Sequence, residues 1–143
     1  MLPSMGRHAP VAANRTARRS WLMSWRIFRS FGFAFAGLWY LLRTQPNARI
    51  HVLVGILACI LGAWLRISRV EWAVVVFTIA LVIILEGLNT AVEAAIDLAS
   101  PEVHPLAKAA KDLAAGMVLV AAIASVAVGL LILGPPLWAR LFG

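Results

Sequence analysis

The sequence predicts an all-α integral membrane protein with three transmembrane helices and an N-terminal amphipathic helix at the membrane interface. Of its 143 residues, 62% are apolar and 13% are charged, which is far from the balance of a soluble domain. Three stretches also have the length of a membrane span, which needs about 20 apolar residues. We expect these spans at residues 49–66, 70–97 and 106–134.

The three spans differ in how clearly the sequence marks them. The third is the clearest, because residues 113–133 carry no charged side chain, and the second is uncharged over residues 72–85. The first is short and needs its flanks to complete a span. The Gln-Pro-Asn segment at residues 45–47 precedes it, and proline disfavours helix at the residue before it. A loop at residues 66–69 then joins the first two spans as an antiparallel hairpin.

The N-terminal part has a different composition. Residues 1–19 are rich in Arg, Ala and Pro, so we expect a disordered extension before a membrane domain at residues 20–143. Within residues 21–43, aromatic and aliphatic side chains alternate with Arg and Ser, which favours an amphipathic helix on the cytoplasmic face. The alternative is a fourth span at residues 27–42, which would be short and would contain Arg29 near its start.

The distribution of basic residues predicts the orientation. Eight of the thirteen Lys and Arg residues lie within residues 1–49, whereas two lie in the loop at residues 66–69 and one lies in the C-terminal tail. Excess basic charge marks the cytoplasmic side, so we expect a cytoplasmic N-terminus in a bacterial inner (plasma) membrane. Trp64, Trp72 and Trp138 then fall at the outer interface. Because the basic run attracts anionic membrane lipids, we expect no nucleic-acid partner.

A polar stripe runs along the second span. Its members lie within an arc of about 100° on a helix, and only small or aliphatic residues separate them. Measured from Trp72 at 1.5 Å per residue, a hydrocarbon core of about 30 Å leaves Glu86 roughly 9 Å inside the cytoplasmic boundary and Glu93 at the interface. Carboxylates at such depth are costly and usually functional. The members of the polar stripe are Glu86, Asn89, Thr90, Glu93 and Asp97.

The stripe is typical of phosphoryl-transfer chemistry, although each member has a simpler interpretation. Glu86 can act as a general base for an alcohol proton, or can hydrogen-bond a neighbouring helix. Glu93 can bind magnesium, which favours one or two carboxylates together with substrate phosphates, or can remain a solvated charge. Asn89 can contact a carboxylate or a phosphate, or another helix.

A charged cluster precedes the third span. Lys111 can neutralise phosphate oxygens, or can be an ordinary lysine reaching out from the membrane edge. Lys108 and Asp112 are four residues apart and can pair along a helix. The sequence contains no Walker motif, so a nucleotide site would have to be built from the spans themselves.

These segments resemble a known family. LEGLNTAVEAAIDLAS followed by HPLAKAAKDLAAG resembles the signature of the prokaryotic diacylglycerol kinases, which include undecaprenol kinase, and the resemblance covers roughly residues 26–133. It implies a small three-span lipid kinase, typically a homotrimer with composite sites between protomers. It also implies ATP- and magnesium-dependent phosphorylation of a lipid alcohol, undecaprenol or diacylglycerol, at the cytoplasmic interface. The NTAVE and HPLAKAAKD details look more like the undecaprenol kinase branch.

The resemblance implies roles for individual residues as well. Glu86 matches the catalytic base, and Glu93 matches a metal-binding glutamate. The positions that match the nucleotide site are Arg26, Phe33, Asn89, Glu93, Glu102, His104, Lys111 and Asp112. The positions expected toward the lipid substrate are Arg26, Asn47, Glu86 and Ala115.

The sequence departs from the family pattern at three places. Gln45 stands where a second metal-binding glutamate is usual, and an amide oxygen is a poorer magnesium ligand than a carboxylate. Phe33 replaces a frequent tyrosine, Ala36 replaces a common lysine, and the Arg-rich extension exceeds what the fold needs. An impaired member acting as a membrane scaffold or lipid-binding protein is therefore an alternative. An unrelated transporter is a third interpretation, against which the position of the carboxylates at one boundary argues.

Overall fold

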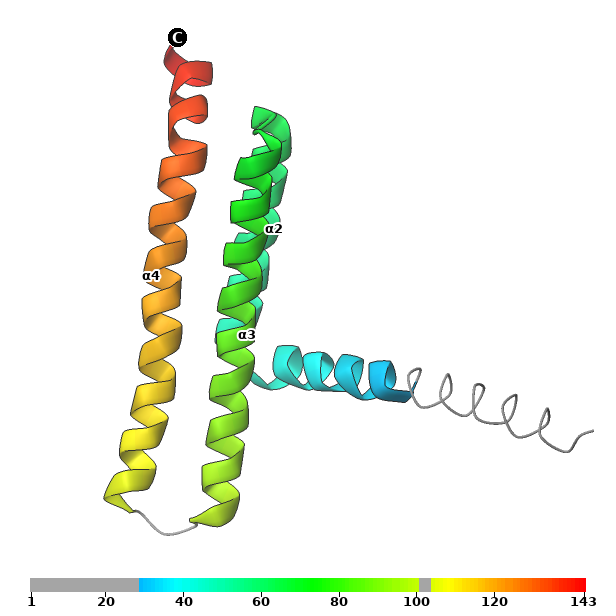
Figure 1. Ribbon diagram of the computed structural model, residues 1–143, viewed down its shortest axis with the longest axis vertical. Coiled ribbons are helices and arrows are strands. Elements are labelled where there is room, and N and C mark those ends of the chain that lie inside the picture. The colour runs from blue at the N-terminus through cyan, green and yellow to red at the C-terminus, as the bar shows by residue number, and fades with distance from the viewer. Residues whose placement is uncertain (1–28, 101–103) are drawn as a thin grey trace, which may run out of the picture. The chain divides into compact units, whose positions relative to one another are not determined.

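A computed structural model describes residues 29–100 and 104–143, and the regular structure in these residues is entirely helical (Figure 1). Residues 29–44 form one helix, and three long helices follow it: α2 (Pro46–Leu65), α3 (Arg69–Ala99) and α4 (Pro105–Phe142). Each long helix has the length and apolar character needed to cross a membrane. The predicted all-α membrane fold with three spans is therefore confirmed.

The chain divides between Trp39 and Tyr40 into two compact units. In the first unit, the described helical residues expose large apolar side chains, including Phe33 and Phe35. They belong to the segment in which we expected an amphipathic surface helix, and its position on the membrane stays a prediction. The expected disordered extension at residues 1–19 lies outside the described residues.

Local signals in the sequence explain where α2 and α3 begin. Gln45 precedes α2 with an extended backbone, and Pro46 occupies the first turn, where a missing N–H does no harm. At α3, the Ser68 Oγ accepts a hydrogen bond from the Glu71 amide at 3.3 Å, and the Glu71 carboxylate accepts one from the Ser68 amide at 2.6 Å. This reciprocal capping box satisfies two amides at the helix start.

The connection between α2 and α3 is shorter than the expected loop at residues 66–69. Arg66 ends α2 in the left-handed conformation (φ 57°, ψ 46°), and its amide donates to the Ala63 carbonyl at 3.3 Å. Arg69 is already the first residue of α3. The result is a tight antiparallel hairpin.

Helix α4 is longer than the expected span at residues 106–134. It continues through Pro135 and Pro136 to Phe142. The fixed φ of proline, near −65°, is compatible with helical geometry, although each proline removes an amide donor. A pattern of apolar residues predicts how much of a helix can be in the bilayer, but it does not predict where the helix ends.

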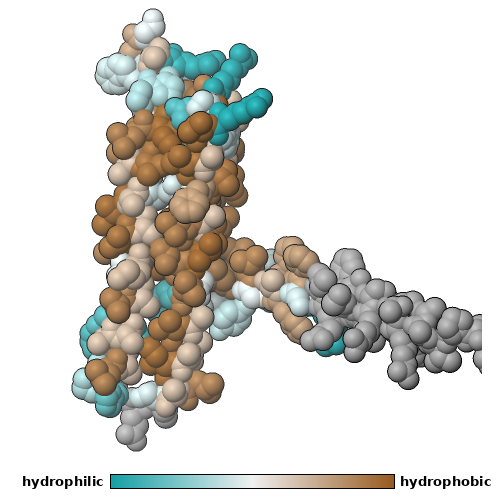
Figure 2. All heavy atoms as spheres, in the orientation of Figure 1, coloured by the Kyte–Doolittle hydropathy of each residue, from teal (hydrophilic) through white to brown (hydrophobic). Residues whose placement is uncertain are grey.

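Small residues allow the spans to approach one another. Helix α3 lies between α2 and α4 in the packing, antiparallel to both (Figure 1). A Cβ at Gly55 would lie 3.0 Å from Ile79 Cγ2, and one at Gly62 would lie 3.0 Å from Ile67 Cδ1. Close backbone contact at small residues is a main source of packing energy between membrane helices. Most large apolar side chains point outward instead, and Figure 2 shows them covering the visible face of the bundle.

We expect Gly55→Val to lower the free energy of unfolding by about 1–3 kcal/mol, because the new side chain must displace Ile79 in a packed interface. Gly129→Val is the matched control, since no atom lies within 4 Å of a Cβ built at Gly129. Reversible unfolding in mixed micelles measures both variants. If the free energy of unfolding fell equally in the two variants, α2 would not be closely packed on α3 at Gly55.

A second prediction concerns topology. With three spans, a tag at residue 1 should report the cytoplasm and a tag after Gly143 the opposite compartment. Accessibility labelling of both tags in intact cells makes the comparison. Two tags in the same compartment would show that the helix containing residues 29–44 crosses the membrane as a fourth span.

Candidate functional site

The polar stripe lies on one side of α3, and the structure buries its inner part. Glu86 is 3% exposed and Thr90 is 8% exposed, and no other polar or charged side chain among the described residues is buried so deeply. Asn89 and Glu93 are half-buried, and Asp97 is exposed in the last turns of the helix. The stripe thus runs from the interior of the bundle to its end, as the helical spacing predicted.

Two acceptors of the stripe lack partners. The Glu86 carboxylate has no hydrogen bond or ion pair within the described residues, although it is buried. The Asn89 Oδ1 atom, three residues further along the same face, is also buried and unsatisfied. By contrast, the Thr90 hydroxyl donates to the Glu86 carbonyl at 3.0 Å and is satisfied within its own helix. An unpaired buried acceptor is unfavourable, so Glu86 and Asn89 present oxygen atoms that need a donor or a cation.

The end of the helix at residues 29–44 comes close to the stripe. Leu41 is buried, and its Cδ2 would lie 3.8 Å from a Cβ at Gly87, the residue after Glu86. Four residues beyond Leu41, the half-buried Gln45 makes no capping bond with its side chain. Its backbone N–H donates to the Leu41 carbonyl at 2.9 Å, which leaves the side-chain amide free of any role in capping α2. Asn47, in the first turn of α2, is exposed.

Arg49 fixes this junction, and sequence reasoning missed that role. Its Nε donates to the Leu42 carbonyl at 2.8 Å, and its Nη2 donates to the Arg43 carbonyl at 2.7 Å. These carbonyls belong to the last turn of the preceding helix, where no intrahelical donor remains. An arginine one turn after a proline-marked break was the available signal. Arg49 thereby holds the segment that carries Gln45.

The charged cluster is already paired. The Lys111 ammonium forms an ion pair with the Asp97 carboxylate, which links the end of α3 to the start of α4. Lys108 and Asp112 pair along α4 at 2.5 Å, and both are exposed, so their contribution to stability is small. The structure thus places Asp97, a member of the polar stripe, in direct contact with Lys111, the lysine expected to bind phosphate.

The remaining predicted site residues are scattered. His104 caps α4, where its Nδ1 accepts a hydrogen bond from the Leu106 amide at 3.2 Å. Ala115 is exposed on α4, and Phe33 is exposed in the first unit. Arg26 and Glu102 lie outside the described residues, so the structure neither supports nor opposes their roles.

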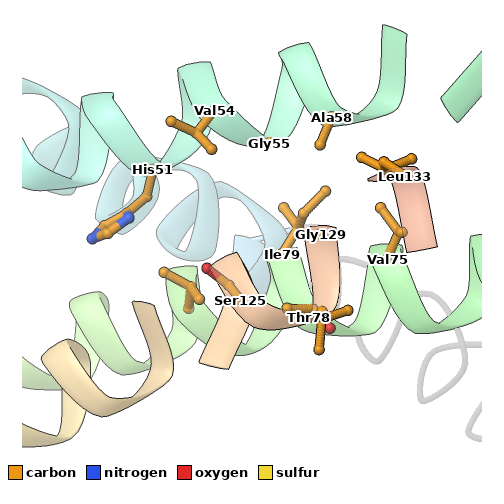
Figure 3. A pocket seen from close by; sticks show the side chains of 12 residues that line it. His51, Val54, Gly55, Ala58, Val75, Thr78, Ile79, Ser125, Gly129 and Leu133 are labelled. Carbon is orange, nitrogen blue, oxygen red and sulfur yellow. The ribbon is translucent and has the colours of Figure 1, made fainter. Parts of the chain in front are cut away.

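A small cavity lies between the three long helices (Figure 3). Its volume of about 70 Å³ is far below the roughly 300–1,000 Å³ of typical small-molecule sites. Its two hydroxyl groups, on Thr78 and Ser125, each donate to a carbonyl of their own helix at 2.8 Å. Neither ATP nor a lipid head group fits inside a cavity of this size. The residues around it include His51, Gly55, Thr78, Ile79, Ser125 and Leu133.

Magnesium fits the donor atoms along the stripe. It prefers oxygen ligands, and usually takes one or two carboxylates together with substrate phosphates. Glu86, Asn89 and Glu93 supply side-chain oxygens on one face, and the Asn89 oxygen is an acceptor with no partner. The described residues contain no group of three His, Cys, Asp or Glu side chains that could hold a metal by themselves. Oxygens of the substrate could complete the ligand set.

Comparison with known proteins identifies the family. A model of the family described as prokaryotic diacylglycerol kinase matches residues 32–133. A diacylglycerol kinase of Synechocystis sp. is 43% identical over 129 residues, which are 90% of this chain and 74% of that protein. An undecaprenol kinase of Bacillus subtilis is 43% identical over 112 residues, which are 78% of this chain and 91% of that protein. A diacylglycerol kinase of Escherichia coli is 31% identical over 101 residues, which are 71% of this chain and 83% of that protein.

The family match includes the whole polar stripe and the cluster around Lys111. Helices α2 and α3 lie within the match, and so does α4 as far as residue 133. The expected class of enzyme, a membrane lipid kinase, is confirmed, and the chain belongs to the prokaryotic diacylglycerol kinase family.

Proposed function

We propose that this protein transfers the γ-phosphate of ATP to the hydroxyl group of a membrane lipid alcohol at the cytoplasmic boundary of a bacterial inner membrane. The observation that carries the proposal is the buried, unpaired Glu86 carboxylate on a stripe that reaches the end of α3. A lipid hydroxyl can approach such a group from the bilayer. A soluble nucleotide can reach the other end of the same stripe from the water.

Glu86 acts as the general base in this proposal. It accepts the proton of the lipid hydroxyl while that oxygen forms a bond to the γ-phosphorus, and the bond from phosphorus to the oxygen of ADP breaks. A nearby cation in the ground state would occupy the carboxylate oxygens that must face the lipid hydroxyl. Glu86 has no such partner among the described residues.

Glu93 would hold magnesium, with Gln45 as a neutral second ligand. Magnesium, when bound, supplies positive charge against the phosphate oxygens. Asn89 lies between the two glutamates along the stripe, and its free Oδ1 can orient a hydroxyl group or a metal-bound water. These roles follow from residues on one helical face, so they need little rearrangement of α3.

Lys111 would bind phosphate oxygens of the nucleotide in place of its present partner, the Asp97 carboxylate. Its ammonium already contacts a carboxylate, Asp97, at the end of the bundle. A phosphate carries more charge and can replace that carboxylate as the partner. Asp97 would then keep the lysine extended across the gap between α3 and α4 until a nucleotide binds.

The acceptor is proposed to be undecaprenol or diacylglycerol, because relatives with both names are equally similar to this chain. The Synechocystis diacylglycerol kinase and the B. subtilis undecaprenol kinase are each 43% identical to it. An apolar groove distinguishes similar lipids only weakly, so the acceptor must be measured. Purified protein supplied with ATP, magnesium and each alcohol separately would identify it.

We also propose that the enzyme works as a homotrimer. Three pockets along the long helices, of about 70, 340 and 360 Å³, are lined by no member of the polar stripe, and the stripe itself is partly open at Asn89 and Glu93. A neighbouring copy packed against that face would close the site and provide further contacts to the nucleotide. Chemical cross-linking in native membranes tests the number of copies.

We expect Glu86→Gln to lower the turnover number by about 10²- to 10⁴-fold, the usual contribution of a positioned general base. Gln is nearly isosteric, so folding and lipid binding should remain. Glu71→Gln, which removes a glutamate from the start of α3, is the control and should keep its turnover. An unchanged rate in Glu86→Gln would exclude Glu86 from catalysis and leave it as a structural residue.

Gln45 provides a test of the metal arrangement. We expect the wild type to be active with an elevated magnesium requirement, and Gln45→Glu to lower that requirement or raise the rate, because a carboxylate binds magnesium better than an amide. Thr44→Glu is the matched control, as it adds the same charge one residue earlier, on an exposed side chain. The measurement is a magnesium titration of lipid phosphorylation at fixed ATP.

The outcomes of this titration differ in meaning. Identical curves for the wild type and Gln45→Glu would show that Gln45 does not face the metal. A wild type that phosphorylates no lipid alcohol, together with an active Gln45→Glu, would favour the alternative of a scaffold protein that has lost catalysis.

A further inference from the structure

The end of the bundle opposite the charged cluster carries its own group of charged and aromatic side chains. It lies where α2 turns into α3 and where α4 ends, and hydrophilic side chains gather there in Figure 2. We call the three arginines in this region, Arg66, Arg69 and Arg140, the arginine patch. The kinase chemistry proposed above uses none of them.

The arginine patch has no compensating acidic partner within the described residues. No ion pair involves any of the three guanidinium groups. Glu71 is the acidic side chain nearest in sequence, and its carboxylate accepts the hydrogen bond from the Ser68 amide at 2.6 Å. Glu71 is therefore engaged in capping α3. The patch keeps an excess of positive charge.

One member of the patch is held in a fixed position. The Arg140 guanidinium lies 4.8 Å from the centre of the Trp64 ring, in a cation–π contact. Its Nη1 also lies 3.5 Å from the Trp64 carbonyl, near the end of α2. A guanidinium stacked in this way retains further N–H donors at its edge, and a planar group held in place loses less entropy on binding an anion.

Aromatic side chains place the patch at a membrane boundary. Trp138 and Phe142 stack with ring centroids 4.6 Å apart on the last turns of α4, on either side of Arg140 in the sequence. Trp64 lies on the neighbouring helix. Tryptophan is enriched at the level of the lipid head groups. An anion that meets the patch at this level is the phosphate of a phospholipid.

We propose that the arginine patch binds the head group of an anionic phospholipid at the boundary opposite the kinase site. Arg140 and Trp64 form the rigid side of the site, and Arg66 and Arg69 contribute from the turn between α2 and α3. Binding would anchor the tight hairpin and the end of α4 to the same lipid layer. The proposal does not depend on kinase activity, so either can fail without the other.

Trp64 provides a local reporter for the test. The full-length protein is reconstituted in phosphatidylcholine vesicles that contain a small fraction of brominated phosphatidylglycerol or brominated phosphatidylcholine. The quenching in Trp64→Phe is subtracted from that of the wild type, which isolates the signal of Trp64. The comparison gives the preference of this site for the anionic lipid.

We expect Trp64 to be quenched more strongly by phosphatidylglycerol, with a preference of about fivefold for each contributing arginine. Arg66→Gln/Arg69→Gln should reduce the preference by about 25-fold, and Arg140→Gln by about fivefold. The matched control is Arg29→Gln/Arg43→Gln, which also removes two positive charges but lies outside the arginine patch. This control should leave the preference for phosphatidylglycerol unchanged.

Three outcomes would overturn the proposal. Equal quenching of Trp64 by the two lipids would show no preference at the patch. An equal loss in the Arg29/Arg43 control would show an effect of net charge alone. Reversal of the quenching by millimolar glycerol phosphate in the water would show a site for free phosphates rather than for lipid.

Discussion

The burial of an unpaired carboxylate in an apolar helix is the constraint on which the rest of the structure depends. Helix α3 is largely aliphatic before Glu86, and that side chain is almost fully covered by the protein. Such a group is unfavourable in the bilayer and in the bundle alike. The surrounding protein already covers Glu86, so the catalytic proposal depends on how tightly the bundle packs at this level of α3.

The two ends of the bundle differ in how their charged side chains are held. At the end with the charged cluster, Lys111 and Asp97 pair across α3 and α4, so charge is nearly balanced and available for exchange. At the other end, Ser68 and Glu71 form a capping box, and Arg140 stacks on Trp64. One end can rearrange its ion pairs around a substrate. The other is fixed by backbone capping and aromatic contact, which suits an anchor.

Much of the fold could be predicted from the sequence, because membrane spans follow from length and apolar composition. The break before α2 and the stripe that includes Glu86 followed from local rules of helix geometry, although α2 begins at Pro46, three residues before the expected span. The continuation of α4 beyond Pro135 did not, because hydropathy measures where a helix can be buried and not where its hydrogen bonds stop. The capping role of Arg49 also depends on the path of the chain after a break. No periodic pattern encodes it.

The candidate site was predictable in its chemistry and less so in its connections. The i, i+3, i+7 spacing places Glu86, Asn89 and Glu93 on one face whatever their neighbours are. The partner of Lys111 depends on how the loop after α3 returns the chain, and sequence spacing favoured only the pair between Lys108 and Asp112. Gln45 shows the opposite case. Its weak affinity for magnesium follows from its chemistry alone, since an amide oxygen carries less charge than a carboxylate. Its place in the fold does not follow from a periodic pattern, because it lies four residues after Leu41, whose side chain lies near Gly87 on α3. A glutamate at this position would add a carboxylate to a bundle in which Glu86 already has no ion-pair partner among the described residues. Stability and metal binding would then make opposing demands on this single position.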